Sequence, residues 1–170
     1  CIESIKQYTE LNSVELIVVA NGCTDGTRQY VEQLGHPFKL IWSDEPLGYT
    51  KATNLGIMAS SGEYVVLLNN DTELLPQSTN LWLNMMEQKF TDSVGMVGPL
   101  MLHDDYSNHD VLIFFCVMIK REVFDKIGLL DEIYSPGGGE DIDFSIRMKN
   151  AGYQIAAVSD VEYMPHISTN

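Results

Sequence analysis

The stretch YVVLLNND, residues 64–71, decides the fold class of this chain. Its first five residues are aromatic or aliphatic, and such a run predicts a strand buried on both faces, in the middle of a sheet that helices cover. Working outward, further strand patterns occur at residues 15–20, 38–42, 94–98, 112–119 and 153–158. Helix patterns fall at residues 24–35, 50–60, 79–90, 121–127 and 142–151. This alternation predicts an α/β fold with a mostly parallel central sheet and helices on both faces.

The chain is expected to form one domain over residues 1–170, because 170 residues with 45% hydrophobic content suit a single core. Its opening residues 1–8, CIESIKQY, resemble the second half of a helix, whereas a parallel sheet would open with a strand. We therefore expect an N-terminally truncated domain that lacks its first strand. Residues 102–110 are polar and turn-like, and we expect a loop there or a place where a longer segment is missing.

Composition and charge narrow the functional classes. The chain has no run of eighteen apolar residues and no leader pattern, so we expect no membrane span and a cytoplasmic setting. Three widely separated cysteines favour free thiols over disulfides or a zinc site. The formal net charge of −14 disfavours nucleic acid as a partner, since that binding depends on Lys and Arg neutralising phosphates. A small phosphorylated ligand is compatible with this charge if a divalent cation bridges it to carboxylates.

Asp71 is the first candidate functional residue. It follows Asn69 and Asn70 at the carboxyl end of the predicted buried strand, and ligands of open α/β sheets bind beyond such strand ends. One carboxylate flanked by amides offers hard oxygen ligands for Mg²⁺ or Mn²⁺ holding a diphosphate. Ordinary turn chemistry explains the same Asn-Asn-Asp sequence, and the local residues alone favour that simpler explanation.

The second candidate is the acidic stretch after Gly137–Gly139, which contains Glu140, Asp141 and Asp143. A glycine loop that ends in carboxylates can close over a substrate and deliver a general base. Acids in a first helical turn also stabilise the helix dipole, and for Asp143 we prefer that structural role. For Asp141 the two roles are equally compatible with the local sequence.

The segment after the first predicted strand, Asn21-Gly22-Cys23, could cradle an anion with its backbone N–H groups. Asp25 and Thr27, just beyond it, are expected to serve as helix-capping residues. Cys23 lacks a neighbouring histidine, so a plain thiol is preferred over a nucleophile. His166 can ligate a metal, although a lone histidine in a tail is more often structural.

Five segments in this order resemble family 2 of the inverting glycosyltransferases, on the A-type nucleotide-sugar-binding fold. The resemblance covers most of the chain and lies in residues 17–27, 48–56, 61–74, 120–132 and 139–153. It implies transfer of a sugar from a UDP- or dTDP-linked donor to a hydroxyl of a glycan, lipid-linked or protein acceptor, in bacterial polysaccharide or glycoprotein synthesis. It also extends the expected location to the inner face of the membrane. The Asn-Asn-Asp-Thr variant, residues 69–72, is similar to the rhamnosyltransferase-type branch.

The resemblance also implies roles for individual residues. Asp71 would hold Mn²⁺ or Mg²⁺, and His166 falls near a late histidine that some members place by the metal. Asp141 would be the general base, with Glu140 as its neighbour. The implied nucleotide-sugar contacts are Asn21, Gly22, Asn54, Asn70 and Asp71.

This chain departs from the family pattern at Ala20, where an Asp usually contacts the nucleotide base. Base recognition is therefore altered or made by Asn21. With the absent first strand, this departure motivates a second hypothesis, a non-catalytic nucleotide-sugar-binding or structural domain of a larger protein. A nucleotidyltransferase on a similar sheet is a third, disfavoured one, because its Gly- and Arg-rich loop would follow that first strand.

Overall fold

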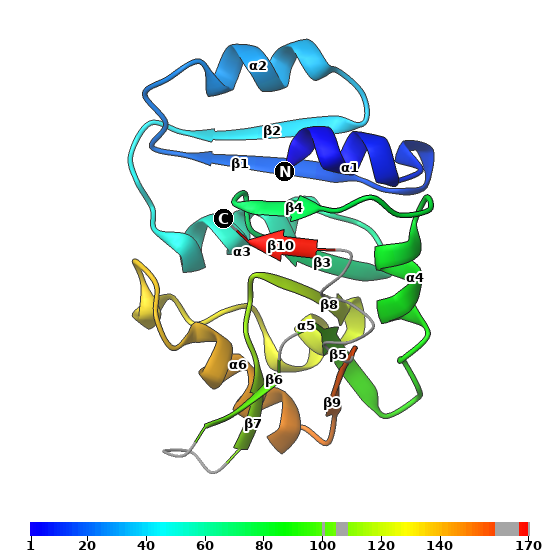
Figure 1. Ribbon diagram of the computed structural model, residues 1–170. Coiled ribbons are helices and arrows are strands. Elements are labelled where there is room, and N and C mark those ends of the chain that lie inside the picture. The colour runs from blue at the N-terminus through cyan, green and yellow to red at the C-terminus, as the bar shows by residue number, and fades with distance from the viewer. Residues whose placement is uncertain (100, 105–108, 159–166, 170) are drawn as a thin grey trace. The chain divides into compact units, whose positions relative to one another are not determined.

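The computed structural model describes residues 1–99, 101–104, 109–158 and 167–169 (Figure 1). Its internal contacts divide the chain into two compact units. Unit 1 comprises residues 1–10, 63–128 and 141–170, and unit 2 comprises residues 11–62 and 129–140. In the described part of the chain, no helix has the length and apolar character needed to span a bilayer.

Unit 2 is built on two parallel strands, β1 (Leu16–Asn21) and β2 (Phe38–Ser43). Helix α2 (Thr27–Leu34) packs mainly on β2, and α3 (Tyr49–Ala59) packs on β1. Short 3₁₀ turns, η1 (Leu11–Ser13) and η2 (Glu132–Tyr134), complete the unit. These strands and helices lie where the apolar patterns predicted them, because a βαβ repeat encodes its periodicity locally.

Unit 1 contains a four-stranded sheet in the order β3, β8, β5, β9. Their bounds are Tyr64–Leu68, Cys116–Lys120, Val94–Gly98 and Gln154–Ala157. Strand β9 is parallel to β5, but β8 runs antiparallel to both β3 and β5. This sheet is therefore mixed, which corrects the expected mostly parallel arrangement. The reversal arises because β8 starts at the end of the sheet where β5 finishes, without a crossover to the opposite end.

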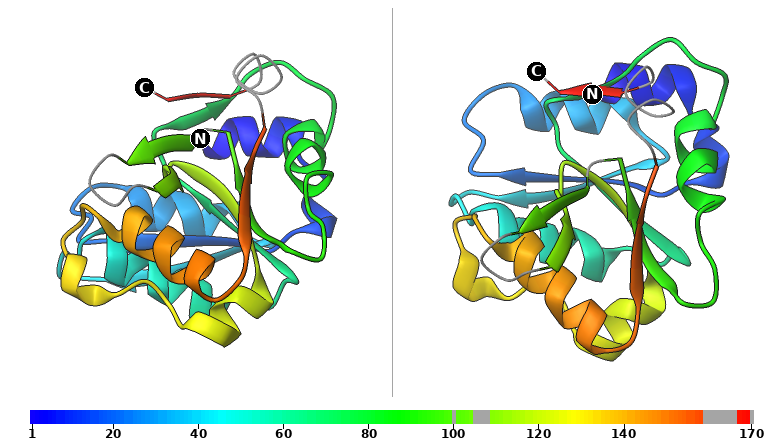
Figure 2. Two further views of the ribbon diagram at one scale, coloured as in Figure 1. Left: turned by 90° about the horizontal axis from the view of Figure 1, so that it is seen from below. Right: turned by 60° about the horizontal axis from the view of Figure 1, so that its bottom comes forward.

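The segment between β5 and β8 is a strand hairpin. Strands β6 (Met101–Asp104) and β7 (His109–Leu112) pair antiparallel and lie beside α6 (Glu140–Asn150), as Figures 1 and 2 show. The expectation of a loop over 102–110 was wrong where these strands form. Backbone pairing overrides a polar composition, since strand formation depends strongly on the neighbouring strand.

Two further short strands were not predicted from the sequence. Strand β4 (Thr72–Leu74) follows β3 directly and pairs antiparallel with β10 (Ile167–Thr169). Three residues are too few to show an apolar period, so only the pairing identifies them.

The remaining helices of unit 1 are α1 (Ile2–Tyr8), α4 (Leu81–Glu87) and α5 (Arg121–Ile127). Helix α1 confirms the expected helical opening. Phe144 of α6 is fully buried in the core of unit 1, with ring centroids 5.9 Å from Phe114 and 5.4 Å from Phe124. Val117 and Ile119 of β8 are fully buried as well.

Candidate functional site

Asp71 lies in the turn that joins β3 to β4. The N–H of Thr72 donates to the carbonyl of Asn69 at 3.1 Å, which makes Asn70 and Asp71 the two central residues of the turn. Both are exposed, whereas Val65 and Leu67 of the preceding strand are buried. The local sequence therefore makes a turn, as its composition suggests, and this turn presents the Asp71 carboxylate to solvent.

The turn is held from both sides. The N–H of Asn69 donates to the carbonyl of Phe115 at 2.8 Å, which ties its start to the chain entering β8. On the other side, the N–H of Leu74 donates to Oγ of Ser4 in α1 at 3.0 Å, a buried hydrogen bond. These contacts fix the backbone around Asp71, so its carboxylate is presented by a defined scaffold.

Glu140 and Asp141 open helix α6, directly after the glycine segment 137–139. The carboxylate of Glu140 accepts from the N–H of Gly138, and that of Asp141 accepts from the N–H of Ile142 at 2.8 Å. Gly139 has a φ of +94°, and a Cβ there would stand 3.2 Å from the Tyr134 ring. Glycine is therefore required for the chain to enter α6 along this path.

Asp143 forms an ion pair within α6, and the helix-dipole role preferred for it stays a prediction. Its carboxylate pairs with Arg147 one turn later at 2.7 Å, and Arg147 also donates to the carbonyl of Ile127 at 3.0 Å. This arrangement ties α6 to the end of α5. Asp143 is thus engaged within the fold, while Glu140 and Asp141 are both half-buried.

In unit 2, Asn21 ends β1 and clamps the turn before α3. Its Nδ2 donates to the carbonyl of Gly48 at 3.2 Å, and its Oδ1 accepts from the N–H of Leu47. The neighbouring Gly22 has a φ of +68° and packs against Pro46. The structure thus assigns both residues a role in holding this turn, and their nucleotide contacts stay predictions.

Asn54 of α3 is nearly inaccessible, with 2% of its surface exposed. Its Oδ1 accepts from the N–H of Leu130 at 3.0 Å and its Nδ2 donates to the carbonyl of the same residue at 2.9 Å. The amide is therefore engaged within unit 2, and its predicted donor contact stays a prediction.

The expected capping roles of Asp25 and Thr27 were wrong: Gly26 occupies the N-cap of α2 with no side-chain cap hydrogen bond, and Thr27 is the first residue of the helix. The Asp25 carboxylate accepts from the backbone N–H of Thr27 at 3.0 Å and from its hydroxyl. These hydrogen bonds from Thr27 lower the pKa of the exposed Asp25 carboxyl. None of the three cysteines forms a disulfide, as expected, and Cys23 is half-buried.

His166 lies outside the described residues. Among those that are described, no group of three or more His, Cys, Asp or Glu side chains converges as a metal site would require. A cation at Asp71 would thus rely on this carboxylate together with amide or carbonyl oxygens, phosphate oxygens and water, a donor set that suits a hard divalent ion.

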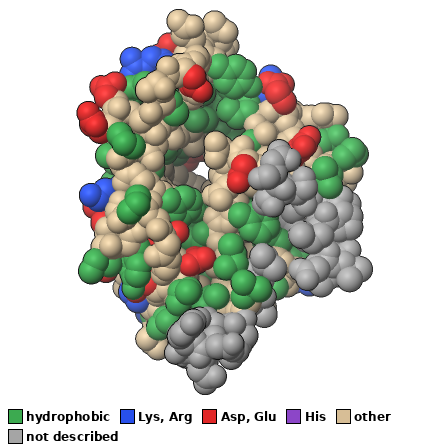
Figure 3. All heavy atoms as spheres, turned by 60° about the vertical axis from the view of Figure 1, so that its left-hand side comes forward, with side chains coloured by type: hydrophobic (Ala, Val, Ile, Leu, Met, Phe, Trp, Pro, Cys, Tyr) green, Lys and Arg blue, Asp and Glu red, His purple; other side chains and the backbone are tan. Residues whose placement is uncertain are grey.

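The candidate residues fall into both units. Asp71 and Asp141 belong to unit 1, and Asn21, Gly22, Asn54 and Glu140 belong to unit 2. Acidic side chains are scattered over the face seen in Figure 3 rather than gathered into one patch.

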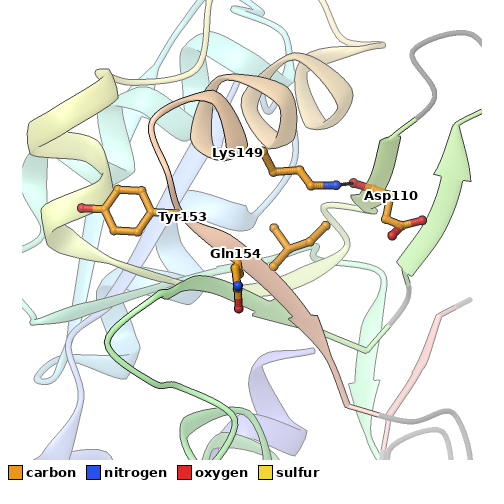
Figure 4. A pocket seen from close by; sticks show the side chains of 5 residues that line it. Asp110, Lys149, Tyr153 and Gln154 are labelled. Carbon is orange, nitrogen blue, oxygen red and sulfur yellow. Dashed lines mark hydrogen bonds between the residues drawn. The ribbon is translucent and has the colours of Figure 1, made fainter.

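A surface pocket of about 360 Å³ lies elsewhere in unit 1 (Figure 4). Its lining includes Asp110 at β7, Lys149 of α6, and Tyr153 and Gln154 at the start of β9. The Lys149 ammonium donates to the Asp110 carbonyl at 3.2 Å. None of its lining residues was selected from the sequence, and the pocket shares no residue with the candidate site.

The sequence did not predict the hydrogen bonds that hold the segment 129–140 to the residues around the start of α3. The hydroxyl of Ser135 donates to the carbonyl of Leu47 at 2.9 Å, and the N–H of Tyr49 donates to the carbonyl of Pro136. The partners are 87 or 88 positions apart, and no local pattern encodes such a pairing. The glycine at position 48 is the one available signal, because only glycine allows this close approach.

The chain matches a family model described as glycosyl transferase family 2 over residues 1–100. It is 24% identical to the O-antigen biosynthesis protein RfbC of Myxococcus xanthus, over 99% of this chain and 16% of that protein. It is 25% identical to an N-acetylglucosaminyl-diphospho-decaprenol L-rhamnosyltransferase of Mycobacterium tuberculosis, over 97% of this chain and 70% of that protein. The chain spans 16% to 21% of the length of two curated relatives that it matches, RfbC among them.

The fold is similar to that of a solved mannosyltransferase, PcManGT from Pyrobaculum calidifontis, in complex with GDP-Man and Mn²⁺. The TM-score is 0.76 at 21% identity, over 94% of this chain and 50% of that one. This likeness confirms the expected α/β glycosyltransferase architecture of the A type.

Proposed function

The chain belongs to glycosyl transferase family 2, and we propose that it transfers a sugar from a UDP- or dTDP-linked donor to an acceptor hydroxyl, with inversion at the anomeric carbon. The acceptor is a glycan, a lipid-linked saccharide or a protein. Similarity to an O-antigen biosynthesis protein and to a rhamnosyltransferase supports sugar transfer in glycan or polysaccharide synthesis.

We assign donor binding to Asp71 with Asn70. The exposed Asp71 carboxylate, just beyond the carboxyl end of β3, is the observation that carries this proposal. Together with Asn70, whose side chain amide is also exposed, it offers hard oxygen donors that fit Mn²⁺ or Mg²⁺. When bound, such an ion neutralises the charge that develops on the departing diphosphate.

We assign the general base to Asp141. In the proposed step the acceptor oxygen forms a bond to the anomeric carbon while the bond from that carbon to the diphosphate oxygen breaks. The hydroxyl proton passes to a carboxylate oxygen of Asp141. Glu140 supports this geometry, because its carboxylate holds the N–H of Gly138 and so shapes the chain that leads into Asp141.

Calorimetric titration of nucleoside diphosphates, with and without Mn²⁺, tests the donor site. We expect Mn²⁺-dependent binding of UDP or dTDP to the wild-type chain and loss of that binding in Asp71→Asn. Asp92→Asn is a matched control, because it removes the same negative charge from an exposed position. Asp92 precedes β5 and so lies at the opposite end of the sheet from Asp71. Equal affinity in wild type and Asp71→Asn would remove Asp71 from the metal site.

A non-catalytic nucleotide-sugar-binding domain is the second candidate. It is favoured by Ala20, which is 2% exposed and offers no polar group where a base-contacting Asp was expected. This candidate predicts metal-dependent nucleotide binding without turnover. Release of nucleoside diphosphate in the presence of donor and acceptor distinguishes the two.

A further inference from the structure

Asn54 has an unusual environment for a polar side chain inside a helix. It is 2% exposed, and burying an amide is costly unless its polar atoms are paired. Both amide atoms pair with the backbone of Leu130, 76 positions away, at 2.9 and 3.0 Å. The Nδ2 of Asn54 makes a third, longer hydrogen bond of 3.4 Å to the carboxylate of Glu132. Asn54 therefore pairs with both backbone groups of Leu130, as a residue of a neighbouring strand would.

The chain beyond residue 132 stays attached to the start of α3. Ser135 donates to the carbonyl of Leu47 at 2.9 Å, and Pro136 accepts from the N–H of Tyr49. Gly48 packs so closely that a Cβ there would lie 2.4 Å from the Cα of Pro136. The segment 130–136 is thus anchored at both ends to α3 and to the turn before it.

Three glycines follow this anchored segment and lead to Glu140 and Asp141. Consecutive glycines have wide conformational freedom, so the anchor before them limits where the following carboxylates can stand. A displacement of about 1 Å at a reacting group can lower a rate by about 10²-fold. The anchoring of residues 130–136 is therefore able to affect the reaction without contacting the donor.

We propose that Asn54 is a positioning residue, which holds the segment 130–140 against α3 and thereby sets the place of Glu140 and Asp141 during transfer. This proposal rests on the proposed glycosyltransferase function. It differs from a donor contact, because the amide is buried and bonded to Leu130.

The test compares Asn54→Ala, Ser135→Ala and Thr9→Val in the full chain. Thr9→Val is a matched control, since it deletes a buried side-chain hydrogen bond, that from Trp82 at 3.0 Å, outside the anchored segment. We expect kcat to fall by about 10²-fold in Asn54→Ala and by a smaller factor in Ser135→Ala. The Kd for the nucleoside diphosphate with Mn²⁺ should stay within about twofold, and Thr9→Val should keep its kcat at a temperature where it is folded.

The outcomes separate the two proposals. Unchanged kcat in Asn54→Ala, or a parallel loss of kcat and nucleotide affinity, would overturn the positioning role and leave the function intact. A wild-type chain that neither binds nucleotide nor transfers sugar would instead overturn the proposed function, and the positioning role with it. If Asn54→Ala does not fold, Ser135→Ala decides, because an unchanged kcat there would show that the anchor does not matter.

Discussion

Glu15 ties three parts of unit 2 together, and its removal should weaken the fold in a pH-dependent way. The carboxylate accepts from Lys39 of β2 at 2.7 Å, and from the N–H of Ser61 at 2.9 Å and its hydroxyl. These hydrogen bonds, that from Lys39 first, lower the pKa of Glu15 from 4.5 to about 2. We predict that Glu15→Gln lowers the free energy of unfolding, because the amide carries no negative charge for Lys39 and has one acceptor oxygen where the carboxylate uses two.

The size of this loss follows from the pKa difference. A lowering from 4.5 to about 2 corresponds to about 3 kcal/mol if the carboxylate were shielded from water. Its side chain is 29% exposed, so solvent screening reduces the contribution, and we expect about 1 kcal/mol. Because the pKa is depressed in the folded state, this stability is present above pH 4.5 and is lost as the pH falls toward 2.

Urea unfolding of the wild type and Glu15→Gln, at about pH 6.5 and about pH 3, measures this difference. The loss of about 1 kcal/mol should appear at the higher pH and shrink at the lower. Glu32→Gln on α2 is the control, since it removes the same charge from an exposed position. A difference that is absent, or that is equal at both pH values, would refute the role of the Glu15 hydrogen bonds.

Three further substitutions test the core of unit 1, the contact between Gly48 and Pro136, and the general base. Phe144→Ala should cost about 3–5 kcal/mol in urea unfolding, because this fully buried ring packs against two others, while Phe144→Leu should cost clearly less. Gly48→Ala should cost about 2–3 kcal/mol, since its φ is +78° and the added Cβ would overlap Pro136; a loss no larger than that of an exposed-surface change would contradict the contact. Asp141→Asn should keep nucleotide affinity and lower the transfer rate by roughly 10²–10⁴-fold, and retained transfer would exclude Asp141 as the base.

The sequence was sufficient to predict the helices and strands that have a clear apolar pattern over consecutive residues. The run 64–68 gave the bounds of β3, and the helix pattern 121–127 gave those of α5, because apolar spacing over a few residues marks an element. The predicted central position of β3 was wrong, since it lies at the edge of the four-stranded sheet and its residues alternate between half-buried and buried. The order of short motifs likewise indicated the family, which the match over residues 1–100 confirms. The position of Asp71 just after a strand was also readable, since strand ends follow from the same pattern.

Tertiary structure alone decided how distant segments pair. The direction of β8, the strands β4 and β10, and the attachment of residues 130–136 to α3 all depend on backbone partners far away in the chain. Backbone carbonyls are the same in every residue, and backbone N–H groups in every residue except proline, so the choice of partner leaves little mark on the local sequence. Asn54 illustrates the difference: the family resemblance implies a ligand contact, whereas its burial and its two bonds to Leu130 are set by the fold.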